Sequence, residues 1–182
     1  IGMAVFQSPG LEAKVGMIGE ITTTGDHLML GYLRSEEQTK EYFRSEDGSG
    51  WSGDLGFMDE DGDFTLIGRS KEMIIAGGMN IYPIEIETIL EEHPEIRECA
   101  VFALTDSVWG ELPAAAVVLQ PGSKLSSQEI IDFSSDHLAH FKRLRFAAVV
   151  GNLPKTAAGK IQRKVLTDRI KKKMEKDSTK LL

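Results

Sequence analysis

The pattern of apolar and polar positions changes character about 70 residues into the chain. Residues 16–23 and 55–58 have the apolar and β-branched content of strands. The Asp61-Gly62 pair predicts a hairpin turn into a further strand at residues 64–67, and a short helix is expected over residues 36–43. The first 70 residues are therefore predicted to be rich in β-structure.

Helix signals dominate the chain after residue 71. Pro83 suits the first turn of a helix that ends before Pro94. Ser126, followed three residues later by Glu129, has the spacing of a capping box and predicts a helix that extends to about residue 139.

Apolar runs and one apolar stripe complete the pattern. Strands are expected near residues 98–103, 114–119 and 146–150. A last helix carries apolar residues at helical spacing, namely Ile161, Val165, Leu166, Ile170 and Met174. Together these elements predict an α+β fold. A small C-terminal domain, residues 71–182, has a short β-sheet flanked by helices, and residues 1–70 form a β-rich piece too short to be a complete domain.

Composition narrows the class of protein. The chain has 182 residues, 41% of them hydrophobic, which is enough for one ordinary core or two small ones. No apolar run reaches the roughly 18 residues needed to span a bilayer, and the start lacks the basic flank of a secretory signal. The single cysteine, Cys99, lies in an apolar run and is expected to be buried. These features favour a cytoplasmic protein without a membrane span.

Charge is distributed unevenly along the chain. The formal net charge is −7, but residues 142–182 hold 13 of the 21 lysines and arginines. Lysines near the end of a helix compensate its dipole, and a solvated basic face is the favoured interpretation. Because the overall balance is acidic and no aromatic residues are interleaved with the basic ones, no nucleic-acid partner is expected.

Three further side chains could have a functional role. His137 and His140 could meet on one helical face, but no third ligand is evident, so no metal site is expected. Trp109 could cap a loop between two strands, and core packing is the favoured interpretation.

Lys160 lies on a loop directly before the last helix. Pro154 stiffens the approach to this loop, and Gly159 removes side-chain bulk beside the lysine. The apolar stripe of the helix would anchor the far side of the loop. A loop lysine is usually only solvated, but this placement would also deliver a mobile cation to a partner or substrate.

Three motifs in order resemble the C-terminal part of the acyl-adenylate-forming superfamily, which includes acyl-CoA synthetases, peptide synthetase adenylation domains and beetle luciferases. They are Gly53-Asp54-Leu55-Gly56, then Gly68-Arg69-Ser70-Lys71-Glu72, then Ala76-Gly77-Gly78-Met79-Asn80. The last continues as Ile81-Tyr82-Pro83, a form common in acyl-CoA synthetases. The resemblance is therefore strongest to a fatty-acid or aryl-acid CoA ligase.

The resemblance implies a function and a set of site residues. The full-length protein would activate a carboxylic acid as acyl-AMP and transfer it to CoA, with ATP and CoA as substrates and Mg²⁺ accompanying ATP. Lys160 would be the catalytic residue and Lys71 the hinge between two domains. Asp54 and Arg69 would bind the nucleotide, and Gly77 and Gly78 would line the channel for CoA.

The same resemblance implies that the chain alone is inactive. The phosphate loop and the adenine-binding motif of the family lie upstream, in an N-terminal domain of which residues 1–70 would be the end. Two alternatives stay open at this point. The chain could act as a non-catalytic interaction or regulatory module, or it could be the end of a different adenylating enzyme.

Overall fold

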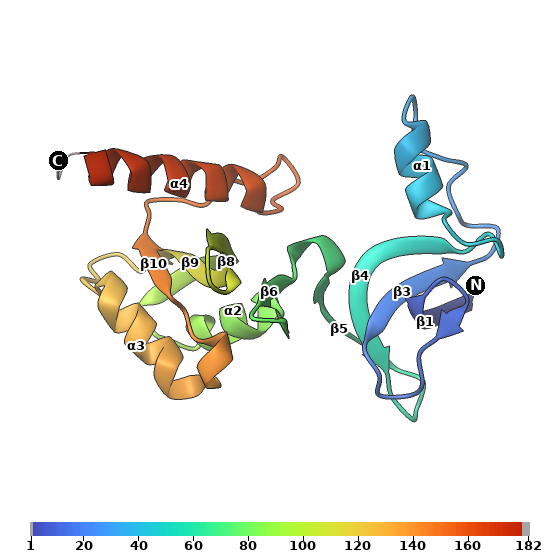
Figure 1. Ribbon diagram of the computed structural model, residues 1–182, viewed down its shortest axis with the longest axis horizontal. Helices are drawn as coiled ribbons and strands as arrows, with labels where there is room; N and C mark the ends of the chain where they lie inside the picture. Colours follow the sequence, from blue (N-terminus) through green and yellow to red (C-terminus); the bar gives the residue numbers. More distant parts are fainter. Residues whose placement is uncertain (1, 180–182) are drawn as a thin grey trace. The chain divides into compact units, whose positions relative to one another are not determined.

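The computed structural model describes the backbone of residues 2–179 and the side chains of residues 2–174. The chain divides into two compact units, an N-terminal unit, Ile1–Lys71, and a C-terminal unit, Glu72–Leu182 (Figure 1). Each unit has its own sheet and its own core. The predicted α+β fold, with a short sheet flanked by helices after a β-rich piece, is confirmed.

The N-terminal unit is built on a five-stranded antiparallel sheet in the order β2-β1-β3-β4-β5. Its elements are β1 (Gly2–Ser8), β2 (Leu11–Glu12), β3 (Gly19–Thr24), α1 (Glu36–Tyr42), β4 (Gly50–Met58) and β5 (Phe64–Arg69). Val5, Ile21 and Trp51 are buried. The Arg44 guanidinium lies 4.1 Å from the centroid of the Trp51 ring, so a cation covers one side of this small core.

The C-terminal unit contains a mixed sheet. β9 pairs in antiparallel fashion with β8 and β6, β6 pairs with β7, and β10 runs parallel to β9. The elements are η1 (Ser70–Glu72, across the boundary), β6 (Ile74–Ala76), β7 (Met79–Ile81), α2 (Pro83–Glu91), β8 (Ile96–Asp106), β9 (Gly110–Leu119), α3 (Ser127–His137), η2 (His140–Lys142), β10 (Phe146–Val149) and α4 (Arg163–Thr179).

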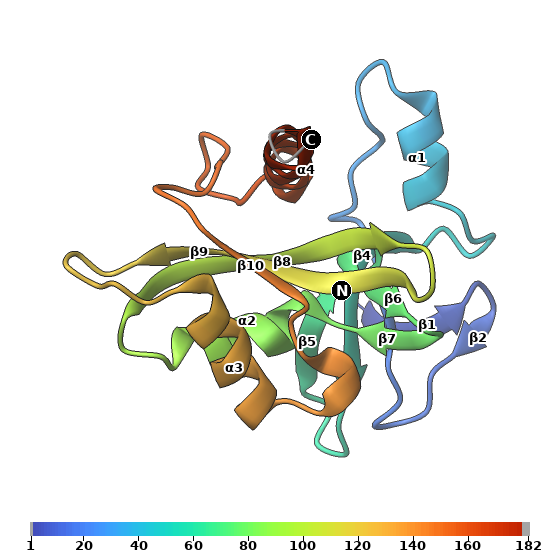
Figure 2. The same ribbon diagram turned by 60° about the vertical axis from the view of Figure 1, so that its left-hand side comes forward.

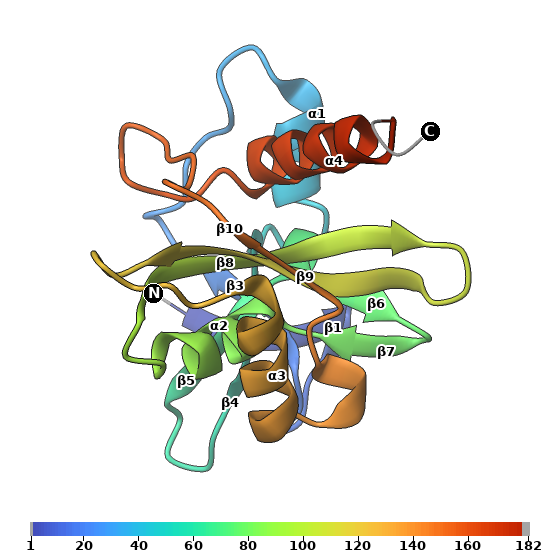
Figure 3. The ribbon, with the colours of Figure 1, turned by 90° about the vertical axis from the view of Figure 1, so that its left-hand side faces the viewer.

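Two hydrophobic clusters lie on opposite faces of this sheet because successive strand residues point to opposite sides. On one face, Val101 and Val117 pack with Ile86 of α2 and Ile130 of α3. On the other, the neighbouring strand residues pack with α4; this cluster includes Ala100, Phe102, Ala116, Leu166 and Ile170. Figures 2 and 3 show α2 and α3 on one side of β8 and β9 and α4 on the other.

Several predicted boundaries hold because the signals behind them are local. Pro83 is the first residue of α2, and Ser126 and Glu129 form both hydrogen bonds of the capping box that opens α3. Cys99 is buried, as expected, in contact with α2. Among the described residues, no helix combines the length and apolarity needed to cross a membrane.

Two expectations about side chains are wrong. Trp109 is not in the core: it is 53% exposed in the turn between β8 and β9, where its backbone N–H donates to Asp106 Oδ1 at 2.8 Å. His137 and His140 do not share a helical face, because α3 ends at His137 and His140 belongs to η2. In residues 2–174, no group of three or more His, Cys, Asp or Glu side chains could hold a metal ion.

Candidate functional site

Asp54 and Arg69 are brought together by the register of β4 and β5. The two residues are paired across the strands, and Arg69 Nε donates to Asp54 Oδ1 at 2.8 Å. The N–H of Gly53, whose φ is +77°, donates to Glu20 Oε1 at 2.9 Å, and the N–H of Asp54 donates to Ser52 Oγ at 3.0 Å. This backbone framework presents a carboxylate and a guanidinium side by side, each partly exposed. Together they can accept from hydroxyl groups and contact a phosphate.

Lys71 is the last residue of the N-terminal unit. Its ammonium lies 2.8 Å from Glu41 Oε1, and hydrogen bonding to Lys71 lowers the pKa of Glu41. Both side chains are well exposed. Exposed pairs of this kind restrain a backbone only weakly.

Gly77 and Gly78 form the turn of a hairpin between β6 and β7, with φ values of +57° and +81°. A second strand, β7, lies between this turn and α2. Gly77 N–H donates to the carbonyl of Trp109 at 2.9 Å, and a Cβ at position 77 would lie 2.6 Å from Trp109 Cε3. A Cβ at Gly78 would meet nothing within 4 Å. The indole therefore covers Gly77 and leaves Gly78 open.

This asymmetry predicts different effects for two alanine substitutions. Both place a side chain at positive φ, at a cost of about 1 kcal/mol, but only Gly77→Ala also has to displace the indole. We expect Gly77→Ala to shift the ¹⁹F resonance of 5-fluorotryptophan at Trp109, while Gly78→Ala leaves it in place. Trp51, in the other unit, is the internal reference. Equal shifts in the two variants would show that the indole does not lie against Gly77.

Lys160 lies in a compact loop that is closed on itself. Lys155 and Ile161 form an isolated antiparallel bridge, and Gln162 N–H donates to the Pro154 carbonyl at 2.8 Å. Within the loop, Thr156 N–H donates to the Lys160 carbonyl at 2.8 Å, and Lys160 N–H donates to Thr156 Oγ1 at 3.2 Å. The backbone of Lys160 is therefore ordered, whereas its side chain is exposed.

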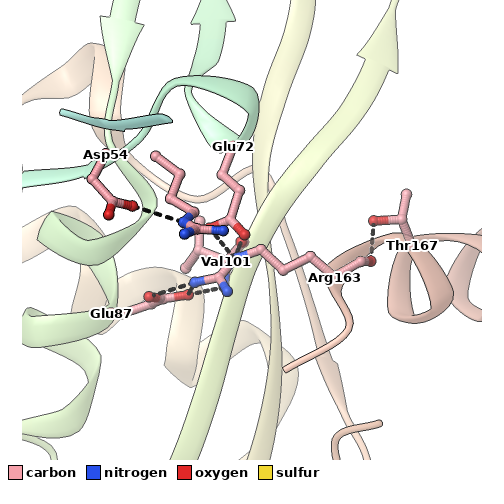
Figure 4. A network of polar contacts seen from close by, with 7 residues as sticks. Asp54, Glu72, Glu87, Val101, Arg163 and Thr167 are labelled. Atoms are coloured by element: carbon pink, nitrogen blue, oxygen red, sulfur yellow. Dashed lines mark hydrogen bonds and ion pairs between the residues drawn. The ribbon is translucent and has the colours of Figure 1, made fainter. Parts of the chain in front are cut away.

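A buried ion pair at the start of α4 was not predicted from the sequence. Glu87 of α2 is 6% exposed, and Arg163 Nη2 donates to its two carboxylate oxygens at 2.6 and 2.9 Å (Figure 4). The N–H of Val101 donates to the same carboxylate at 2.7 Å. Burial raises the pKa of Glu87, and the Arg163 charge acts in the opposite direction. The two residues are 76 positions apart, so no local pattern could have revealed the pair.

The predicted site residues fall on four segments. Asp54 and Arg69 meet in the N-terminal unit, and Lys71 ends that unit. In the C-terminal unit, Gly77 and Gly78 lie on the hairpin before α2, and Lys160 lies on the loop before α4.

Comparison with known protein families finds a match within the C-terminal unit. Residues 85–160 match the family described as "AMP-binding enzyme C-terminal domain". This stretch of the C-terminal unit is thus similar to an AMP-binding enzyme C-terminal domain. The resemblance drawn from the three motifs is confirmed by this match, which covers most of α2, the sheet strands β8 to β10 and the lysine loop up to Lys160.

Relatives that align with most of the chain are CoA ligases. The oxalate–CoA ligase of Saccharomyces cerevisiae is 39% identical over 153 residues, which are 84% of this chain and 28% of that protein. The 2-succinylbenzoate–CoA ligase of Bacillus licheniformis is 37% identical over 87% of this chain and 32% of that protein. The chain thus spans about a third or less of the length of these relatives.

Solved structures agree with the sequence relatives. The ATP-bound MatB of Rhodopseudomonas palustris is 34% identical and superposes with a TM-score of 0.85, over 92% of this chain and 33% of that one. The o-succinylbenzoate CoA synthetase MenE of Bacillus subtilis, in complex with the acyl-adenylate intermediate OSB-AMP, is 32% identical with a TM-score of 0.81, over 91% of this chain and 33% of that one.

Proposed function

We propose that the whole protein is an AMP-forming acyl-CoA synthetase and that this chain supplies the end of its N-terminal domain and its mobile C-terminal domain. The observation that carries the proposal is the similarity to CoA ligases, which extends over both units and includes 84% of the chain in the oxalate–CoA ligase alignment. Relatives whose structures hold ATP or an acyl-adenylate support a nucleotide and an activated acid as ligands.

In the first half-reaction, a carboxylate oxygen of the acid would bond to the α-phosphorus of ATP while the bond to pyrophosphate breaks. Negative charge concentrates around the phosphorus, and a positioned cation stabilises it. Lys160 is proposed as that cation, because its backbone is ordered and its side chain is exposed. Asp54 would accept from the ribose hydroxyls and Arg69 would contact the nucleotide, as their shared exposed position allows.

In the second half-reaction, the CoA sulfur would bond to the acyl carbon while the bond to AMP breaks. We propose that the hairpin at Gly77 and Gly78 lines the channel for the pantetheine arm, with Gly78 as the open position and Trp109 beside it. Glycine permits close backbone approach to a thin ligand. Lys71 is proposed as the hinge about which the C-terminal domain rotates between the two steps.

The remaining substrate contacts are proposed to lie in the rest of the N-terminal domain, which would provide the phosphate loop and the acid pocket. Mg²⁺ would enter with ATP and be held largely by the phosphates, as is usual for this ion.

The proposed function is tested on the whole protein with ATP, Mg²⁺, CoA and a panel of aliphatic, aromatic and dicarboxylic acids. Pyrophosphate release together with a CoA thioester, identified by mass spectrometry, is the expected result. Transfer of the acyl group only to the pantetheine of a carrier protein would instead indicate a peptide synthetase. Absence of ATP turnover with every acid would favour the non-catalytic module.

The hinge is tested by Lys71→Pro, which restricts φ at the proposed pivot. We expect acyl-adenylate formation to continue while transfer to CoA slows, so that pyrophosphate is released in about stoichiometric amount without matching acyl-CoA. Lys71→Ala is the control, because it removes the ammonium and its pair with Glu41 but leaves the backbone unrestricted. Normal coupled turnover in the proline variant would rule out a hinge at this position.

A further inference from the structure

We infer that Arg163 is a positioning residue for Lys160 and that the buried carboxylate of Glu87 is the point to which it is fixed. The inference rests on the proposed adenylation role of Lys160. In this inference, a network of polar contacts inside the C-terminal unit fixes the position of the backbone from which the Lys160 side chain extends.

The loop that carries Lys160 is held at both ends. At its start, the Lys155 ammonium pairs with Glu98 of β8. At its end, three residues after Lys160, Arg163 pairs with Glu87 of α2. Between these anchors, the internal hydrogen bonds of the loop make it one compact piece. Leu153 and Ile161 at the two ends of the loop also pack with the cluster that holds α4. Among the charged side chains at these two ends, Arg163 is the one that pairs with a buried carboxylate.

Arg163 contacts three separate segments of the unit (Figure 4). Besides Glu87, its Nε donates to the Val101 carbonyl at 3.2 Å and lies 3.4 Å from Glu72 Oε2. Val101 is fully buried and Glu72 directly follows Lys71. A planar guanidinium can satisfy acceptors in several directions at once, which the single ammonium of lysine cannot reproduce. The Arg163 side chain thus fixes the start of α4 relative to α2, to β8 and to the segment at Glu72, where the C-terminal unit begins.

Stability alone does not account for this arrangement. Leu166 and Ile170 already hold α4 on the sheet by burying their side chains. A buried ion pair is often no more stabilising than apolar residues of the same volume. The ion pair adds a defined geometry at the end of the lysine loop, where the loop meets α4. Because the Gly77 hairpin also leads into α2 through β7, the two segments proposed to serve the two half-reactions are tied to the same helix.

The experiment uses Arg163→Lys, which keeps the charge and loses the multiple contacts. Arg169→Lys, at an exposed position of the same helix, is the matched control. In this chain, we expect ¹⁵N order parameters at Thr156 to Lys160 to fall from about 0.85 towards 0.6 or below in Arg163→Lys only. Amides of Leu166 and Ile170 should keep their values. A loop as rigid as in the unmodified chain would overturn the inference.

The same variants are then measured in the whole protein. Arg163→Lys should lower the rate of acyl-adenylate formation by about tenfold or more, since a misplacement of about 1 Å can cost 10²-fold. Transfer to CoA from supplied acyl-adenylate should be unchanged. Equal loss of both half-reactions would mean that Arg163 is only structural and would overturn the inference. Glu87→Gln, which keeps an acceptor for Val101 N–H, is the second variant and should give the same selective loss.

The two hypotheses can fail separately. If Lys160→Ala leaves adenylation intact, the proposed role of Lys160 is wrong, whatever the order parameters show. If Lys160→Ala abolishes adenylation while Arg163→Lys changes neither the loop dynamics nor the rate, the role of Lys160 stands and the positioning role of Arg163 is wrong.

Discussion

Lys160→Ala is expected to lower the rate of acyl-adenylate formation in the whole protein by about 10²–10³-fold, the range found when one donor to a developing oxyanion is removed. The reason is that the variant removes the proposed mobile cation from the transition state and leaves the backbone of the loop, which is closed by the bonds between Thr156 and Lys160, intact. Transfer of the acyl group from supplied acyl-adenylate to CoA should survive. The measurement is ATP–pyrophosphate exchange beside a separate thioester assay.

Lys164→Ala is the matched control for this experiment. Lys164 is also exposed and lies four residues further on, in the first turn of α4. Its substitution by alanine removes one positive charge from the same region. Its rates should stay close to those of the unmodified protein. Equal losses in the two half-reactions of Lys160→Ala would mean that Lys160 is structural, and an equal loss in Lys164→Ala would mean that general charge, not position, is what matters.

Arg163→Met is expected to lower the free energy of unfolding of the C-terminal unit by about 3 kcal/mol, because it leaves the Glu87 carboxylate buried without its ionic partner. The double variant Glu87→Leu/Arg163→Met removes both charges and should recover much of this loss. Urea denaturation, followed by far-UV circular dichroism and by the ¹⁹F resonance of 5-fluorotryptophan at Trp109, measures the stability of both variants. A double variant that is less stable than Arg163→Met alone would contradict this account.

The destabilisation by Arg163→Met should also depend on pH. Burial already raises the pKa of Glu87, and loss of Arg163 removes a charge that acts in the opposite direction. A carboxyl group whose pKa is higher in the folded than in the unfolded state favours folding at low pH, and this contribution is lost as pH rises through the folded pKa. The stability difference between the variant and the unmodified chain should therefore shrink as pH is lowered. A difference that grows on acidification would show that Glu87 is not the group responsible.

The similarity to CoA ligases covers the chain but only about a third or less of each relative. The chain itself contributes the Asp54–Arg69 pair in the N-terminal unit, and a glycine hairpin and a lysine loop in the C-terminal unit.

The sequence by itself determined the features that depend on neighbouring residues. Pro83 begins α2, and Ser126 with Glu129 opens α3, because caps act within one turn of helix. The Asp61-Gly62 turn joins β4 to β5 for the same local reason. The three motifs gave the resemblance to adenylate-forming enzymes, and the family match at residues 85–160 agrees with it.

Only the tertiary structure decided the features that join distant segments. The strands β6 and β7 have three residues each, too few for a period of two to be visible, and they form because β9 and the turn of glycines hold them. Trp109 lies over Gly77 because β6 and β9 meet there. In the sequence, Arg163 has the position of an ordinary arginine at the start of a helix. Folding brings it to Glu87, 76 residues away, where burial makes it costly to leave the carboxylate without its partner.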